Sequence, residues 1–233
     1  MARLYRIATW AALSLAGLWG GVGAEPPQGK GRSDLPLPKP RLDGGLPLVQ
    51  AMKKRRSERD FTSQPLTQAQ VSQLLWSAQG TTDESIGLRT APSAGALYPL
   101  DIYLVVGEGG VEGLGAGIYL YNPHQHSTRL LATGDFRERL AKACLRQMFI
   151  AQAPLCLVIT AEYRRITEDY GDRGMRYAHF EVGHVGQNIY LQAVALGLGT
   201  VAVGAFYEHA VSEALHLPDQ HKPLYVMPVG YPE

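Results

Sequence analysis

Residues 154–161 read PLCLVITA, an apolar stretch without a charged side chain. A strand with one solvated face alternates apolar and polar residues, whereas a continuous apolar run of this length is typical of a strand covered on both faces. The stretch therefore predicts a sheet whose faces are both packed against other elements.

Periodic segments surround this run on both sides. Thr67 and Gln70 have the spacing of a capping box at the start of a helix that Gly80 ends. The expected helices are 67–79, 135–149, 175–196 and 208–216, and the expected strands are 100–106, 117–121, 128–131, 154–161, 200–206 and 224–229. Helices and strands intermix, with hairpins as well as crossovers, which predicts an α+β fold: a mixed sheet covered by helices. No GxGxxG motif follows a strand, so the sequence does not support a Rossmann-type nicotinamide site.

The first 24 residues have the pattern of an export signal. Arg3 and Arg6 precede an apolar stretch from Ile7 to about Leu18, and residues 22–24 (VGA) offer a cleavage site. The apolar stretch is shorter than the roughly 20 residues of a membrane span. We expect cleavage and an exported product, periplasmic or secreted; an uncleaved N-terminal membrane anchor is the alternative.

Residues 25–47 contain six prolines and four glycines and show neither helical nor strand periodicity. We expect a linker here, followed by one domain over residues 48–233. Removal of residues 1–24 leaves 20 Lys and Arg against 21 Asp and Glu, because the chain has 22 and 21 and the segment contains two arginines and no acid. This balance argues against nucleic-acid binding through bulk charge.

The two cysteines, Cys144 and Cys156, lie in a helical and a strand pattern. Export permits a disulfide, but sequence spacing does not show that its geometry is met; two buried free thiols are our expectation. His124 and His126 fall in a hairpin turn, and His179 and His184 are five residues apart on one helix, so no metal site is predicted.

Residues 55–61 read RRSERDF, with three arginines and a serine just before a helix. Guanidinium groups hold phosphate oxygens in pairs of hydrogen bonds, and a serine hydroxyl can complete such a site. The segment therefore predicts an anion site for a cofactor phosphate. A solvated basic face, or a basic patch beside a membrane anchor, is the alternative.

Two further segments suit a flat ligand. Residues 91–99 (APSAGALYP) lead into a strand, and residues 197–206 (GLGTVAVGAF) leave a helix and end in small residues. Small residues let backbone amides approach a planar group closely. Together with a phosphate site, they point to FMN.

These segments give the chain a resemblance to the FMN-dependent nitroreductase superfamily and, within it, to the SagB-type dehydrogenases. The resemblance covers residues 48–231 and rests on RRSxRxF, PSAGALYP, YGxRGxRY (170–177), GHxxQN (183–188), GLGT and the closing VGYP (229–232). Family members are intertwined homodimers with a flavin at the interface, so the resemblance implies that this chain is a homodimer of that kind.

The resemblance also implies roles for individual residues. The FMN phosphate and ribityl chain would lie on Arg55, Arg56, Ser57 and Arg59, the isoalloxazine ring beside Ser93, Ala94 and Gly95, and flavin N5 beside the amides of Gly204 and Ala205. SagB-type azoline dehydrogenases have a Lys-Tyr pair where this chain has Asp169-Tyr170, which leaves Tyr170 as a catalytic candidate and argues against azoline oxidation.

Three functions follow as hypotheses. The first is an exported FMN oxidoreductase that passes two electrons, as hydride through flavin N5, to or from a small organic substrate. Its electron donor is open, with NAD(P)H expected only in the cytoplasm. The others are an azoline dehydrogenase and a flavin-binding or flavin-free protein without catalysis.

Overall fold

The computed structural model describes residues 34–233. The signal-like segment and the first part of the proline-rich segment lie outside these residues, so cleavage and export stay predictions. Within the described part of the chain, every helix is too short or too polar to span a bilayer.

One sheet organises the described residues. Its strands are β1 (Leu35–Pro36), β4 (Leu100–Val106), β5 (Gly117–Asn122), β6 (Ser127–Thr133), β7 (Leu155–Ala161), β8 (Gly199–Thr200) and β9 (Lys222–Gly230), in the order β1-β6-β5-β4-β7-β9-β8. Each neighbouring pair is antiparallel, so the expected mixed sheet is corrected to an antiparallel one. A separate hairpin pairs β2 (Thr81–Asp83) with β3 (Leu88–Arg89).

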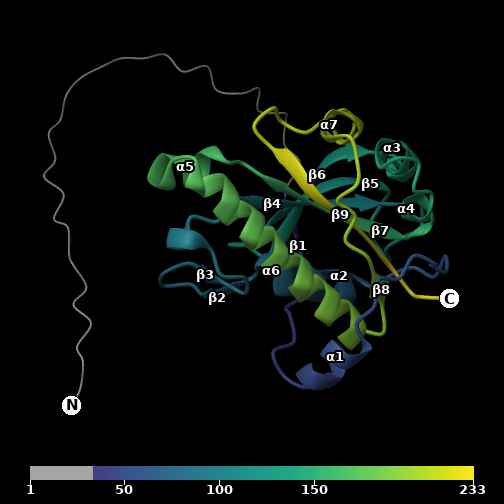
Figure 1. The fold of residues 1–233 in the computed structure, drawn as a ribbon. Coiled ribbons are helices and arrows are strands. Elements are labelled where there is room, and N and C mark those ends of the chain that lie inside the picture. The colour runs from purple at the N-terminus through teal and green to yellow at the C-terminus, as the bar shows by residue number, and fades with distance from the viewer. Residues whose placement is uncertain (1–33) are drawn as a thin grey trace, which may run out of the picture. The chain divides into compact units, whose positions relative to one another are not determined.

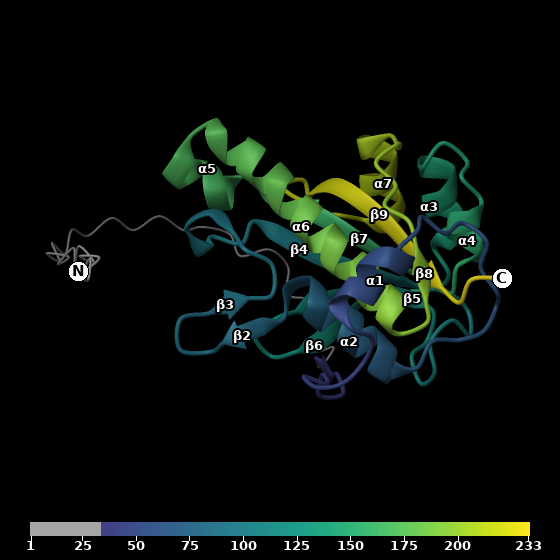
Figure 2. The same ribbon diagram turned by 60° about the horizontal axis from the view of Figure 1, so that its bottom comes forward.

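Helices lie on both faces of the sheet (Figures 1 and 2). They are α1 (Leu48–Lys54), α2 (Gln68–Gln79), α3 (Arg137–Ala143), α4 (Phe149–Gln152), α5 (Arg164–Tyr170), α6 (Arg173–Ala195) and α7 (Glu208–Leu215), with a 3-10 turn at Ala94–Ala96. All seven residues of β7 are buried. Leu155, Leu157 and Ile159 pack in the core formed with α2 and α6, while Cys156 and Val158 pack in the core formed with α3, α4 and α7. The α+β class and the two-sided burial of 154–161 are confirmed.

The predicted start of α2 is confirmed in detail. Thr67 Oγ1 accepts a hydrogen bond from the Gln70 amide at 3.2 Å, and Gln70 Oε1 accepts one from the Thr67 amide at 2.9 Å. Helices α6 and α7 lie within two residues of their predicted bounds. Cys144 and Cys156 are buried free thiols, as expected.

Two predicted elements are wrong. The helix expected over 135–149 is split into α3 and α4, because Leu145 and Arg146 have φ values of 55° and 61°. The strand expected over 200–206 has only its first residue in β8, followed by one bridge between Val203 and Val226. The amide of Ala202 donates instead to a side chain of α6, as described below.

The expected linker is also corrected over residues 34–47. Leu35 and Pro36 form β1 and pair with Thr128 and Ser127 at the sheet edge, where a proline is tolerated. The Arg41 amide donates to Gln73 Oε1 at 2.8 Å. This part of the proline-rich segment is therefore docked on the domain.

Candidate functional site

The arginine cradle (Arg55, Arg56, Ser57 and Arg59) follows α1 as an extended segment. The Arg55 guanidinium lies over the Tyr190 ring at 5.2 Å from its centroid, and that of Arg59 lies over Phe149 at 5.9 Å. Arg56 donates to backbone carbonyls of its own segment. Within residues 34–233, none of the three arginines forms an ion pair with a carboxylate. Their charges are therefore free to hold an external anion.

The cradle is tied to the segment that follows α6. The Glu58 amide donates to the Thr200 carbonyl at 3.0 Å. Tyr190, on α6, connects the two segments a second time: its hydroxyl lies 3.1 Å from Ser57 Oγ and accepts a hydrogen bond from the Ala202 amide at 2.8 Å. Tyr190 was not among the predicted site residues, although it lies close to the GHxxQN motif of the helix.

Gly204 and Ala205 are exposed just beyond this connection. The Ala205 carbonyl accepts a hydrogen bond from Gln147 Nε2 at 3.0 Å. Gln147 lies two residues before Phe149, the ring under Arg59, so the break between α3 and α4 supports both the cradle and the 204–205 segment. The structure thus brings the predicted phosphate-binding and N5-facing residues together.

Ser93, Ala94 and Gly95 lie in a separate loop that includes the 3-10 turn. Gly95 has φ of 63°, and a Cβ at this position would lie 3.0 Å from the Tyr170 hydroxyl. Tyr170, the last residue of α5, packs edge-to-face on Tyr177 at 5.2 Å. The catalytic candidate therefore lies against the predicted ring-lining loop, at a point where a side chain on residue 95 would be strained by the backbone and crowded by Tyr170.

The loop and the cradle lie on different sides of α6. Ser93 lies beside the Glu181 carboxyl of this helix, and the cradle contacts Tyr190. Nine residues separate these two positions, which is two and a half turns, so they point in opposite directions and are about 13 Å apart along the axis. Within one chain, the helix stands between the two predicted halves of the site.

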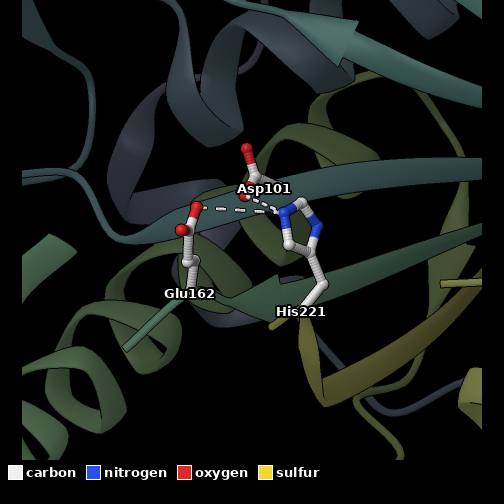
Figure 3. Close-up of side chains that lie close together, drawn as sticks. All are labelled: Asp101, Glu162 and His221. Carbon is white, nitrogen blue, oxygen red and sulfur yellow. Dashed lines mark ion pairs between the residues drawn. The ribbon is translucent and has the colours of Figure 1, made fainter. Parts of the chain in front are cut away.

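A group of titratable side chains that the sequence did not predict lies at one end of the sheet: Asp101, Glu162 and His221 (Figure 3). His221 Nε2 is 3.6 Å from Asp101 Oδ2 and 3.9 Å from Glu162 Oε2, and its Nδ1 bonds the Tyr103 hydroxyl at 2.7 Å. Such a set has the ligand types of a metal site. Arg165, however, already bridges both carboxylates at 2.9 and 2.7 Å. We therefore assign the group to an ion-pair network that ties α5 to the sheet.

The α+β fold with its arginine cradle and small-residue loop beside a long helix has counterparts among known proteins. Residues 52–231 match the model of the Nitroreductase family, and the chain belongs to that family. A protein from Methanocaldococcus jannaschii with a provisional nitroreductase name is 50% identical over 185 residues, which cover 79% of this chain and 91% of that protein.

A crystal structure of a provisionally named nitroreductase from Ralstonia eutropha superposes with a TM-score of 0.76 at 29% identity, covering 92% of this chain and 96% of that one. The trifolitoxin-processing protein TfxB of Rhizobium leguminosarum is 29% identical over 138 residues, covering 55% of this chain and 35% of TfxB. The family and the nitroreductase fold expected from the motifs are thus confirmed.

Proposed function

We propose that this chain is an FMN-dependent oxidoreductase that transfers two electrons, as hydride through flavin N5, to or from a small organic substrate. The observation that carries the proposal is the arginine cradle. Its segment is joined through Tyr190 and Glu58 to residues 200–202, which lead directly into the exposed residues 204–205. A dianionic phosphate next to a segment of bare backbone matches the two ends of FMN.

The residues present fit this cofactor. Arg55, Arg56 and Arg59 would hold the phosphate, with Ser57 as a further donor, and the exposed amides of 204–205 would lie at the reactive side of the ring. Bound FMN would supply the hydride chemistry, which the side chains themselves lack. The chain's own contribution is to bind and orient the cofactor and to place Tyr170 as a hydrogen-bond or proton donor beside Gly95.

We propose further that two copies of the chain form each site. The loop and the cradle lie on opposite sides of α6, so a second copy could bring its loop to the first copy's cradle without passing through the helix. Exposed apolar side chains on α1 (Leu48, Val49 and Met52) and on α6 (Met175 and Phe180) are consistent with a covered face.

Purified full-length protein tests the cofactor. We expect flavin absorbance, FMN on chromatography of the acid-released ligand, and a dimeric mass by light scattering. Substitution of both Arg55 and Arg59 by Ala should weaken FMN binding by roughly a hundredfold to ten-thousandfold, because each arginine would give at least one charge-assisted hydrogen bond worth about 1.5–3 kcal/mol. Arg139→Ala is the matched control, since Arg139 also lies over an aromatic ring, Phe136, at 5.8 Å.

A colourless protein that takes up no added FMN would refute the cofactor assignment. Unchanged FMN affinity in the double variant would refute the cradle assignment alone. A control variant that loses FMN equally would show that the effect is one of stability.

A SagB-type azoline dehydrogenase is the second candidate, favoured by the similarity to the trifolitoxin-processing protein. Asp169 at the lysine position of the Lys-Tyr pair argues against it. Oxidation of an azoline-containing peptide by the purified flavoprotein, with no reduction of nitro compounds or quinones, would favour this candidate over the first.

From the signal-like pattern of residues 1–24 we propose a periplasmic or secreted protein whose electron donor is not a cytoplasmic nicotinamide. Cell fractionation and N-terminal sequencing of the product test this. A start at Glu25 supports it, and an intact N-terminus in the cytosol refutes it.

A further inference from the structure

The loop that the proposed function assigns to the flavin ring has an unusual backbone. Gly95, Ala96 and Tyr98 have φ values of 63°, 54° and 47°. Left-handed backbone is unfavourable for residues with a Cβ, and it persists only where the surroundings hold it. Gly95 and Ala96 are exposed, so the holding contacts must come from the flanks of the loop.

Five residues form a continuous chain of contacts around these flanks, which we call the loop clamp: Gln79, Arg89, Ser93, Tyr98 and Glu181. Ser93 Oγ accepts from the Tyr98 amide at 2.9 Å, and the Tyr98 hydroxyl accepts from the Arg89 amide at 3.0 Å. Arg89 Nη1 donates to Gln79 Oε1 at 3.2 Å, and Gln79 Nε2 donates to Glu181 Oε1 at 3.1 Å. These bonds connect Ser93 to Glu181 through the other three residues, and Ser93 also lies near enough to the Glu181 carboxyl to oppose the rise in its pKa.

Gln79, Tyr98 and Glu181 are buried, and the other two members of the clamp are half-buried. The clamp joins elements that are far apart in the sequence. Gln79 ends α2, Arg89 lies in β3, and Glu181 is in the middle of α6. The Arg89 guanidinium also stacks on the Tyr98 ring at 4.4 Å. Ser93 and Tyr98, at the two ends of the loop, are both members of the clamp, so the clamp fixes both ends of the loop.

Glu181 is the member that structural packing explains least. It is 2% exposed on the apolar face of α6, and its Oε2 has no hydrogen-bond partner. Burial raises the pKa of its carboxyl, although hydrogen bonds from Ser93 and Gln79 oppose the shift. An apolar residue would fill the position without the desolvation of a carboxyl group. We therefore expect the role of the acid to lie in the hydrogen bonds that it makes.

We propose that Glu181 is a positioning residue for the flavin ring: through its hydrogen bond with Gln79 and the contacts that continue to Arg89, Tyr98 and Ser93, it holds the 93–98 loop in its left-handed conformation. This inference rests on the proposed function for the identity of the ligand. Glu181 does not touch the cofactor, because its side chain is covered; it sets the shape of the surface that does.

The first test needs no flavin. In Glu181→Leu we expect amide hydrogen exchange over residues 93–98 to speed up at least tenfold, while exchange over β7 stays unchanged. Glu181→Gln keeps an acceptor toward Gln79 and a polar group toward Ser93, so its loop should exchange like that of the unsubstituted protein. Equal exchange in Glu181→Leu and the unsubstituted protein would overturn the proposal.

The second test measures FMN affinity by quenching of flavin fluorescence. Glu181→Leu should raise the Kd at least tenfold, and Glu181→Gln less than threefold. Gln79→Leu interrupts the same clamp from α2. The double variant should bind FMN no more weakly than the weaker of the two single variants, because both changes interrupt one chain of contacts. Additive losses of FMN affinity would contradict the idea that the clamp residues act as one unit. Gln79→Leu keeps the test available if Glu181→Leu does not fold.

Tyr103→Phe is the stability control. It removes a buried hydrogen bond to His221 in the core on the other face of the sheet. An equal loss of FMN affinity in this variant and in Glu181→Leu would overturn the positioning role. If the unsubstituted protein binds no FMN, the proposed function fails while the exchange experiment still decides whether the clamp holds the loop.

Discussion

Removal of one hydroxyl group, in Tyr190→Phe, should separate the arginine cradle from the segment at 200–205. That hydroxyl accepts from the Ala202 amide at 2.8 Å and lies 3.1 Å from Ser57 Oγ. The variant keeps the aromatic ring under Arg55, so the cation–π contact at 5.2 Å is retained. The substitution therefore tests the two hydrogen bonds and little else.

The magnitude follows from the surroundings of the two partners. The half-buried Ala202 amide loses a hydrogen bond worth about 1 kcal/mol, and exposed Ser57 can turn to water and loses about 0.5 kcal/mol. The sum of about 1.5 kcal/mol corresponds to an FMN affinity about tenfold weaker if the bonds serve to place the cradle. The same loss lowers Tm by only about 3–6 °C in a domain of this size.

Fluorescence titration of the apoprotein with FMN and thermal unfolding of the FMN-free protein measure the two effects separately. Tyr207→Phe is the control, since Tyr207 is 66% exposed on the segment before α7. Our reasoning is refuted if Tyr190→Phe lowers Tm while the Kd for FMN stays at the value of the unsubstituted protein. That outcome would make Tyr190 a purely structural residue.

Two further predictions concern stability. Gly174→Ala should destabilise the chain by about 1–2 kcal/mol, seen as a lower denaturant midpoint, because the added Cβ would lie 2.8 Å from the Ile166 carbonyl oxygen of α5; an unchanged midpoint contradicts this. Burial lowers the pKa of both His221 and His126, so the unfolded chain binds more protons than the folded one. Above the ordinary histidine pKa of about 6.5, these two side chains are neutral in both the folded and the unfolded chain. As the pH falls below that value, the unfolded chain takes up protons that the folded chain does not, so the free energy of unfolding decreases. Tm should fall over this range, and less steeply in His221→Gln; a Tm that rises on acidification contradicts the assignment.

Local sequence patterns predicted the elements whose causes are local. The apolar run at 154–161 and the capping box at Thr67 each depend on residues next to one another in the chain, and both are confirmed. The helix break at Leu145 and Arg146 contains no glycine or proline from which it could have been predicted. Its left-handed residues bring Gln147 to the Cys144 carbonyl and to the Ala205 carbonyl 58 residues away, and a contact of that kind is invisible in the sequence.

The candidate site divides in the same way. Arginines and a serine in one short segment predict an anion site by residue type alone, whereas Tyr190 and Glu181 have partners more than a hundred residues away in sequence. Glu181 did leave a signal. It lies three residues after Ala178 and four before Val185, so it is an acid on the apolar face of a helix.

Helix α6 also supplies the sharpest test of a site shared between two chains. One chain would have a broken cradle, with Arg55 and Arg59 changed to Ala, and the other a broken loop, with Gly95→Val, which forces a β-branched residue into φ of 63° against Tyr170. Neither variant alone should bind FMN tightly. If each site combines the cradle of one copy with the loop of the other, a mixed dimer has one intact site and one doubly broken site.

Random pairing after co-expression should then restore FMN at about a quarter of all sites, because half of the dimers are mixed and each has one good site of two. A site contained within one chain predicts no recovery, since every chain carries a defect. The result depends on geometry alone and not on which substrate the enzyme uses. Recovery would place the flavin between two copies of the chain, as we propose from the opposite orientations of Tyr190 and Glu181 on α6. No recovery would mean that the loop of one copy and the cradle of the other do not form one site.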